Sequence, residues 1–181
     1  MPIDRAEAWK LLNEYVQTAL LKHCLAVEAA MRAYARKYNE DEELWGITGL
    51  LHDMDYEKFP DKHPFHGVEI LKSLNYPDEV IQAILGHALY SGVARETPMA
   101  KCLFAVDELC GFVMACGYVR PTRLEGLEVK SVKKRLKEKS FAAKVNRGEI
   151  AQGIAELGVP EDEHIALVIK AMQAIAPQLG F

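Results

Sequence analysis

The chain has 181 residues, half of them hydrophobic and 27% charged, with a formal net charge of −4 at pH 7. This length and composition are typical of a soluble globular protein that buries a substantial core, most simply within one domain. No apolar run reaches the roughly 20 residues that a membrane-spanning helix needs, because Asp107 and Glu108 interrupt the best candidate, residues 102–119. The first five residues lack the basic and then apolar pattern of a signal peptide, so we expect a cytoplasmic protein with no membrane partner.

Apolar residues at helical spacing predict five helices in the first half of the chain. These helices are predicted over residues 4–17, 18–39, 42–53, 63–74 and 77–87. Thr18 is a candidate N-cap for the second helix. The third contains Gly46 and Gly49 three positions apart, which indicates close contact with another helix, since glycine is otherwise unfavourable there.

Residues 88–96 are predicted to be a loop, and Thr97 caps a long sixth helix that reaches about Val119. That helix is apolar nearly all round, as expected of a helix at the centre of a protein. Later helices are predicted over residues 129–139, over 147–157 and from 160 onward. Because nothing resembles a strand ladder or a repeat, we predict an all-α, single-domain helical bundle. Its core would span about residues 18–120, followed by a C-terminal helical extension over about 121–181.

The four cysteines lie in apolar helical stretches and form no Cys-x-x-Cys pair. We therefore expect free, buried thiols rather than disulfides or a zinc site built from thiolates.

A histidine–aspartate doublet, His52-Asp53, closes the apolar run of the third helix. Burying an imidazole beside a carboxylate costs several kcal/mol unless a partner such as a cation satisfies both. His23, in the first turns of the second helix, and Asp107, an acid within the apolar sixth helix, are further potential ligands. Imidazole and carboxylate donors on separate helices are typical of a metal site in a helical core.

Four donors, His23, His52, Asp53 and Asp107, would hold one divalent ion, and two more histidines around a bridging Asp53 would hold a second. The candidates for the second site are His63 or His66, together with His87. The absence of thiolates favours Mn²⁺, Fe, Zn²⁺ or Mg²⁺ over a structural thiolate zinc site, and Ni²⁺ and Co²⁺ are not distinguished from these.

This order of histidines and aspartates resembles the HD superfamily of metal-dependent phosphohydrolases, over roughly residues 20–115. The later His63-x-x-x-Gly67 is similar to HDIG-type members and favours His63 over His66 as a ligand, and His87 resembles the extra ligand of dinuclear branches. Met54 and Asp55 stand where many members have Ile-Gly, no Gly-Tyr-Pro triplet occurs, and the Glu-Asp pair of stringent-response hydrolases is not in register. The chain is most similar to small, stand-alone members of the superfamily.

The resemblance implies a metal-dependent phosphohydrolase acting on a nucleotide or another small phosphorylated metabolite. Asp53 would bridge the ions or orient the attacking water, and Asp55, Glu57 or Glu108 would protonate the leaving group. The residues expected to contact or neutralise the phosphate are Lys58, His66 and Lys101. We expect His164 to be a surface residue.

Residues 130–147 contain eight Lys or Arg and one Glu, a segment charge of +7 that leaves −11 on the rest of the chain. The segment has two interpretations. It is either a solvated helix face above Val129, Val132 and Leu136, or an electropositive lid over the metal site. In the second case the substrate contacts would be Lys133, Lys134 and Arg135. A negative net charge and the absence of interleaved aromatic residues argue against a nucleic-acid partner.

Two further hypotheses belong to other functional classes. Four histidines and two aspartates can also hold a di-iron centre, as in an oxygenase of the HD fold. A non-catalytic ligand sensor that contains a metal is the other alternative. The sequence also leaves a homodimer open.

Overall fold

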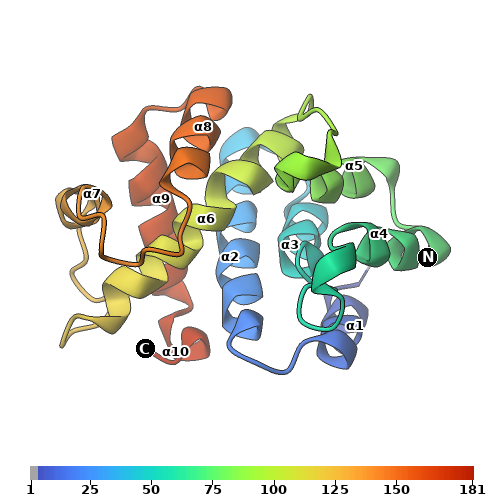
Figure 1. Ribbon diagram of the computed structural model, residues 1–181, viewed down its shortest axis with the longest axis horizontal. Helices are drawn as coiled ribbons and strands as arrows, with labels where there is room; N and C mark the ends of the chain where they lie inside the picture. The colour runs from blue at the N-terminus through green and yellow to red at the C-terminus, as the bar shows by residue number, and fades with distance from the viewer. Residues whose placement is uncertain (1–3) are drawn as a thin grey trace.

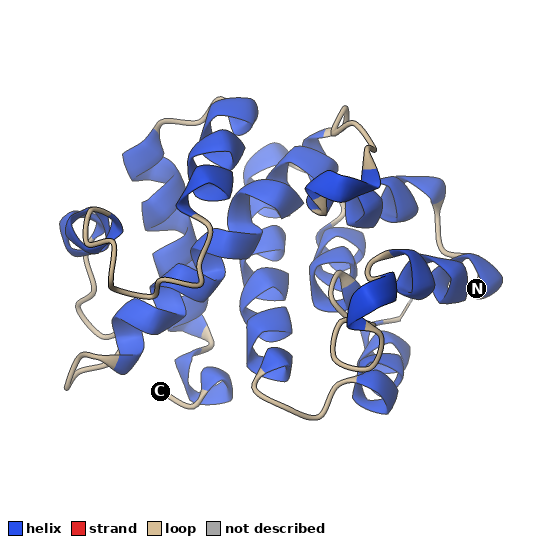
Figure 2. Cartoon of the chain, in the orientation of Figure 1, coloured by secondary structure: helices blue, strands red, loops and turns tan. Residues whose placement is uncertain are grey.

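A computed structural model of the protein describes residues 4–181, and these residues form helices and loops without a strand (Figure 1, Figure 2). The N-terminal half contains α1 (Arg5–Tyr15), α2 (Leu20–Tyr38), α3 (Glu42–Leu51), the 3₁₀ turn η1 (Pro60–Lys62), α4 (Phe65–Ser73) and α5 (Asp78–His87). The C-terminal half contains the 3₁₀ turn η2 (Leu89–Ser91), α6 (Pro98–Tyr118), α7 (Val129–Leu136), α8 (Arg147–Leu157), α9 (Glu161–Ala174) and α10 (Ala176–Leu179). The predicted all-α fold is confirmed.

The two longest helices, α2 and α6, cross each other in the middle of the molecule (Figure 1). The hydroxyl of Thr97 caps α6 by accepting a hydrogen bond of 3.2 Å from the N–H of Ala100, as the sequence predicts. Side chains on nearly every side of α6 are buried, among them Leu103, Val106 and Phe112. The central position predicted for this helix is therefore confirmed, and it is what brings Asp107 into the interior.

Helices α2 and α3 lie in close contact because α3 carries glycine where the two backbones meet. A Cβ atom at Gly49 would lie 2.9 Å from the carbonyl oxygen of Val27, and one at Gly46 would overlap the Arg32 side chain. The side chain of Asp41 caps α3 by accepting from the N–H of Leu44 at 3.0 Å. The spacing of the two glycines thus reports a real helix contact, and it fixes the end of α3 against α2.

Several helix ends differ from their predicted positions. The N-cap of α2 is Ala19, although the Thr18 hydroxyl still accepts from the N–H of Leu20 at 3.3 Å. Helix α7 ends at Leu136 rather than near Lys139, and the short α10 was not predicted. Helix α8 begins and ends where the sequence predicts.

The expectation that His164 lies at the surface is wrong. Helix α9 packs this side chain between α2 and α6, where it is completely buried. Its Nε2 donates to the carbonyl of Ala105 at 3.0 Å, and its Nδ1 accepts from the Tyr34 hydroxyl. Burial lowers the pKa of His164, because a charged imidazolium is poorly solvated there.

All four cysteines are free and buried, as expected. Burial raises the pKa of Cys116 to about 11 and raises the pKa of the other three as well, which keeps them as thiols. Among the helices of residues 4–181, none combines the length and the apolarity needed to cross a membrane.

Because the pKa of His164 is lower in the folded protein than in the unfolded chain, acid should destabilise the fold through this residue. Below the unfolded value of about 6.5, the unfolded chain binds a proton that the folded protein excludes. We expect the unfolding free energy to fall between pH 7 and pH 5.5 by at most about 1 kcal/mol, the limit set by the unfolded pKa. Urea unfolding across that range should show a flatter pH dependence for His164→Gln than for the unmodified protein. Parallel curves would contradict the assignment, whatever the absolute stability of the variant.

Candidate metal centre

The His52-Asp53 doublet directly follows Leu51, the last residue of α3, and His52 is the C-cap of that helix. His52 is buried, and its Nδ1 donates to the carbonyl of Gly49 at 2.7 Å. This hydrogen bond directs Nε2 of the ring toward Asp53 and Asp107. Within the described residues, His52 Nε2 is the buried side-chain atom that has no hydrogen-bond partner. Such an unsatisfied imidazole nitrogen is what a metal ion would complete.

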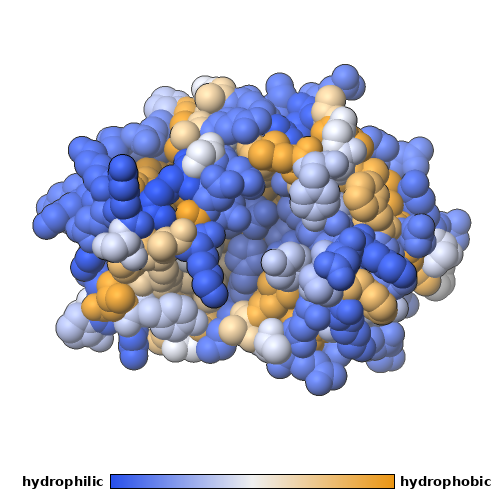
Figure 3. All heavy atoms as spheres, in the orientation of Figure 1, coloured by the Kyte–Doolittle hydropathy of each residue, from blue (hydrophilic) through white to orange (hydrophobic). Residues whose placement is uncertain are grey.

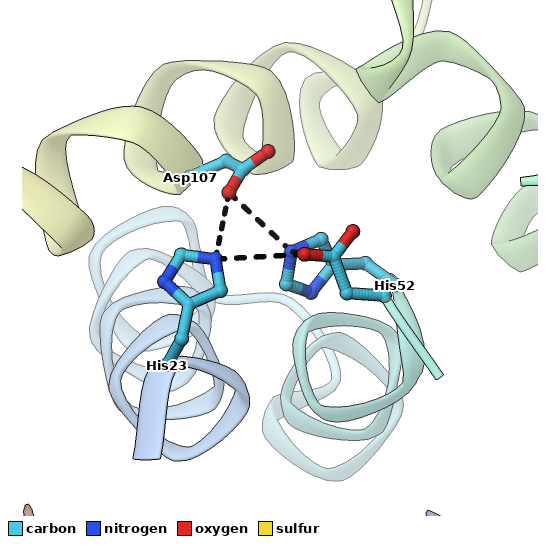
Figure 4. A group of neighbouring side chains, drawn as sticks. His23, His52 and Asp107 are labelled. Carbon is cyan, nitrogen blue, oxygen red and sulfur yellow. Dashed lines mark hydrogen bonds and ion pairs between the residues drawn. The ribbon is translucent and has the colours of Figure 1, made fainter. Parts of the chain in front are cut away.

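Three other side chains, those of His23, Asp53 and Asp107, lie around this nitrogen, and Figure 4 shows His23 and Asp107 beside His52. His23 comes from α2 and Asp107 from α6, and their Nε2 and Oδ1 atoms lie 2.9 Å apart. His52 Nε2 is 3.4 Å from Asp107 Oδ1 and 3.4 Å from Asp53 Oδ2. One ligand atom from each of the four residues lies within 4.8 Å of the others, which is close enough for all four to coordinate one ion.

A second group of ligands shares Asp53 with the first. Asp53 Oδ1 lies 3.3 Å from Nε2 of His63 and 3.3 Å from Nε2 of His87. The two imidazole nitrogens are 3.2 Å apart. Asp53 therefore offers one carboxylate oxygen to each group, and the prediction of His63 rather than His66 agrees with this geometry.

Hydrogen bonds behind the ligands fix the orientation of the two imidazoles in the second group. His63 Nδ1 donates to Asp55 Oδ1 at 2.6 Å, and His87 Nδ1 donates to the carbonyl of Ile84. The second oxygen of Asp55 accepts from the N–H of Gly67 at 2.7 Å. A Cβ at Gly67 would lie 3.1 Å from the Asp55 carboxyl carbon, so glycine makes room for this contact. Partners of this kind hold a histidine in the tautomer that binds metal.

The charged groups of the cluster shift one another's pKa values. Burial alone would raise the pKa of Asp53 and of Asp107, but the neighbouring histidines outweigh burial and lower both. Burial likewise opposes a charge on His52, yet the two carboxylates raise its pKa well above the usual value. A proton on His52 therefore serves as the counter-charge of the carboxylates, in the place that a divalent cation would take.

Five of the six candidate ligands, all except the buried His52, line a pocket of about 400 Å³ that opens to the surface, hereafter the metal pocket. The face drawn in Figure 3 is hollowed near its centre, and the inside of the hollow is hydrophilic. Beyond the ligands, the pocket is lined by Tyr56, Ala88, Leu89, Tyr90, Glu108, Gly111, Lys144, Val145 and Glu149. The Tyr90 hydroxyl donates to the carbonyl of His63 at 2.7 Å, so it supports a ligand as well as the pocket wall.

The family model of the HD domain matches residues 20–111. The chain belongs to the HD domain family. The match runs from the start of α2 to the middle of α6 and includes all six candidate ligands. No solved structure was found that matches the chain. HD domains are typically metal-dependent hydrolases, and the cluster of histidines and aspartates is one that could bind divalent metal.

Several residues that the sequence suggested for catalysis do not line the metal pocket. Asp55 is buried behind His63 with both oxygens engaged, so it orients a ligand and does not face a substrate. Glu57 instead accepts from the Thr18 hydroxyl at 2.8 Å and ties the start of α2 to the loop. Lys58 donates to the carbonyl of Glu14, with its ammonium 5.2 Å from the centre of the Tyr15 ring.

Two predicted substrate contacts are also elsewhere. The ring of His66 lies against Phe59, with 4.1 Å between ring centroids. Lys101 lines a different pocket, beside Tyr38 and Glu96. Of the three proposed proton donors, Glu108 lines the metal pocket. Tyr90 and Glu149 also line it, and neither carries a signal in the sequence.

Lys133, Lys134 and Arg135, the substrate contacts of the lid interpretation, do not line the metal pocket. Lys133 pairs with Glu161 at 2.8 Å and Asp162 at 2.6 Å, and with Lys134 it lines an open groove of about 1060 Å³ between α7 and α9. Arg135 pairs with Glu138 at 2.7 Å. Val132 is buried beneath them, as in the solvated-face interpretation. Of the eight lysines and arginines in residues 130–147, Lys144 is the one that lines the metal pocket.

Metal binding to the HD cluster should release protons and strengthen as the pH rises. The raised pKa of His52 means that this ring holds a proton, which a cation must displace, until the pH exceeds that value. The aspartates, whose pKa values are lowered, stay charged and do not contribute. Titration calorimetry with Mn²⁺ in buffers of different ionisation enthalpy should detect the release and a weaker affinity at pH 6 than at pH 8. Equal affinity at both values with no proton release would contradict this account.

Proposed function

We propose that this HD protein hydrolyses small phosphate esters, a nucleotide or another phosphorylated metabolite, with the help of divalent metal ions. The observation that carries the proposal is the position of Asp53, whose two oxygens face two separate groups of imidazole ligands. A bridging carboxylate between two ions is the arrangement expected of a site that holds both the attacking and the leaving oxygen of a phosphoryl group.

The donor set fits hard or borderline cations, since it contains imidazole and carboxylate groups without thiolate. When bound, such ions would lower the pKa of a water molecule and polarise the phosphoryl oxygens. The chain supplies the remaining functions. Asp55 holds His63 in place, the carbonyl of Ile84 holds His87, and the carbonyl of Gly49 holds His52.

Protonation of the leaving group needs an acid that faces the pocket. Glu108 and Glu149 both line it, on α6 and α8. Burial raises the pKa of Glu149, with a further contribution from the charge of Asp107. A carboxyl group whose pKa is raised is a better proton donor near neutral pH. We infer that these two residues, rather than Asp55 or Glu57, serve the leaving group.

The volume of the pocket favours a small substrate. About 400 Å³ lies at the lower end of the roughly 300–1,000 Å³ that small-molecule sites span. The basic groove that includes Lys133 and Lys134 is lined by α7 and α9, and it shares no lining residue with the metal pocket. These features support a metabolite over a nucleic-acid substrate, in agreement with the negative net charge.

The proposal is tested by screening the metal-replete protein against phosphate monoesters and diesters. Asp53→Ala should abolish hydrolysis of whichever ester is turned over, because it removes a ligand from both groups. Asp61→Ala is the matched control, since Asp61 is an exposed aspartate in η1 and lies outside both groups. Consumption of O₂ by an iron-loaded protein would favour the di-iron oxygenase instead. A protein inert to every ester yet stabilised by one of them would favour the sensor.

A second prediction separates one ion from two. His87→Gln removes a ligand from the group of Asp53, His63 and His87 and leaves the group that contains His23 and Asp107 complete. Elemental analysis after dialysis should find about half of the metal of the unmodified protein, and kcat should fall at least about 10–100-fold. Metal content and kcat that both equal those of the unmodified protein would argue against a second ion.

A further inference from the structure

One wall of the metal pocket comes from residues beyond the HD match. The match ends at Gly111, whereas Lys144, Val145 and Glu149 line the pocket from the other side. The first two belong to the loop of residues 137–146, which joins α7 to α8 and passes in front of α6 in Figure 1. This loop brings a segment distant in sequence to the entrance of the site.

Arg147, the first residue of α8, fixes the shape of that loop. Its guanidinium group lies over the Phe112 ring, 5.0 Å from the ring centre, which anchors it to α6. It donates hydrogen bonds to the backbone carbonyls of Leu136, Glu138, Phe141, Ala142 and Val145. The loop is therefore wrapped around one side chain, and Lys144 lies inside the wrapped segment.

A second anchor ties the loop directly to the site. Glu108 lies beside the ligand Asp107 on α6, and it accepts from the N–H of Asn146 at 2.8 Å. The amide of Asn146 donates to Glu149 at 2.8 Å, and Glu149 also lines the pocket. The loop thus has a fixed position relative to the metal ligands.

Lys144 is the one lysine or arginine among the lining residues, and the other charged residues there, apart from histidines, are Asp53, Asp107, Glu108 and Glu149. Within residues 4–181, Lys144 makes no salt bridge, in contrast to Lys133, which pairs with two carboxylates. Its side chain is also exposed to solvent. An unpaired cation fixed at the mouth of an acidic pocket is suited to an anionic part of a ligand.

We propose that Lys144 binds the phosphate group of the substrate and favours phosphate monoesters over diesters. The inference rests on the proposed hydrolase function and assigns a specificity-determining residue to it. A monoester near neutral pH carries up to two negative charges on its phosphate, whereas a diester carries one. Lys144 adds a positive charge outside the ligand cluster, so it contributes more to binding of the more highly charged group.

The decisive measurement is the affinity of the Mn²⁺-loaded protein for inorganic phosphate, obtained by titration calorimetry. Lys144→Ala should weaken phosphate binding about five- to tenfold, as expected on losing one charge-assisted contact at an exposed site. Lys139→Ala removes an exposed lysine from the same loop that does not line the pocket, and it should change the affinity less than twofold. Bound manganese should be equal in all three proteins, because neither lysine belongs to the ligand groups.

Kinetics provide an independent measurement. For a phosphate monoester, Lys144→Ala should raise KM about five- to tenfold with little change in kcat, because the contact is made in both the ground state and the transition state. For a diester with the same leaving group the increase in KM should be smaller. Equal increases for the two esters would overturn the proposed preference for monoesters.

The outcomes separate this inference from the function on which it rests. Unchanged phosphate affinity in Lys144→Ala, or an equal loss in Lys139→Ala, would overturn the role of Lys144 even if ester hydrolysis is intact. A loss confined to Lys144→Ala in a protein that hydrolyses no ester would support the anion site and reject the hydrolase.

Discussion

The arrangement of the interior depends on the carboxylate of Asp53, whose side chain is only 15% exposed. A negative charge at this depth is stable only among positive or hydrogen-bonding partners, and here those partners are imidazoles from α2, α3, α5 and the turn before α4. Each partner must therefore reach the same point from a different segment of the chain. The glycine contact between α2 and α3 and the central position of α6 are the packing features that make this possible.

Hydrogen bonds behind the candidate ligands fix the orientation of the imidazole rings. The ring nitrogens that face away from Asp53 donate to carbonyls at the ends of α3 and α5, or to Asp55. Asp55 in turn depends on Gly67, where the missing side chain lets the carboxylate reach the backbone N–H. The spacing between His63 and Gly67, which resembles a family motif in the sequence, therefore has a physical cause in this packing.

The helices could be predicted because their apolar residues recur at the spacing of the buried face. Their environment was harder to predict, and His164 is the clearest case. Its position on α9 gives no indication that α2 and α6 cover that side. The clustering of the candidate ligands could be predicted because few other roles suit a His-Asp doublet with further histidines and an acid in an apolar helix. The roles of the residues that follow the doublet could not be predicted, because successive residues of a tight turn point in different directions. Asp55 turns inward to His63, whereas Glu57 turns outward to the start of α2 and Lys58 turns outward to α1. The two interpretations of the basic segment could not be separated from the sequence for a different reason. Its charge is a property of composition, and which of its lysines reaches the pocket depends on long-range contacts made by Arg147 and Glu108.

The loop wrapped around Arg147 determines the shape of the pocket entrance, and therefore which ligands can fit there. Five backbone carbonyls held by one guanidinium group leave that segment little conformational freedom, so the entrance has its shape before any ligand arrives. A site framed in this way recognises molecules by complementarity to a rigid outline. Because the loop is already ordered in the free protein, binding costs less conformational entropy. Such a site needs no lid that closes over the ligand.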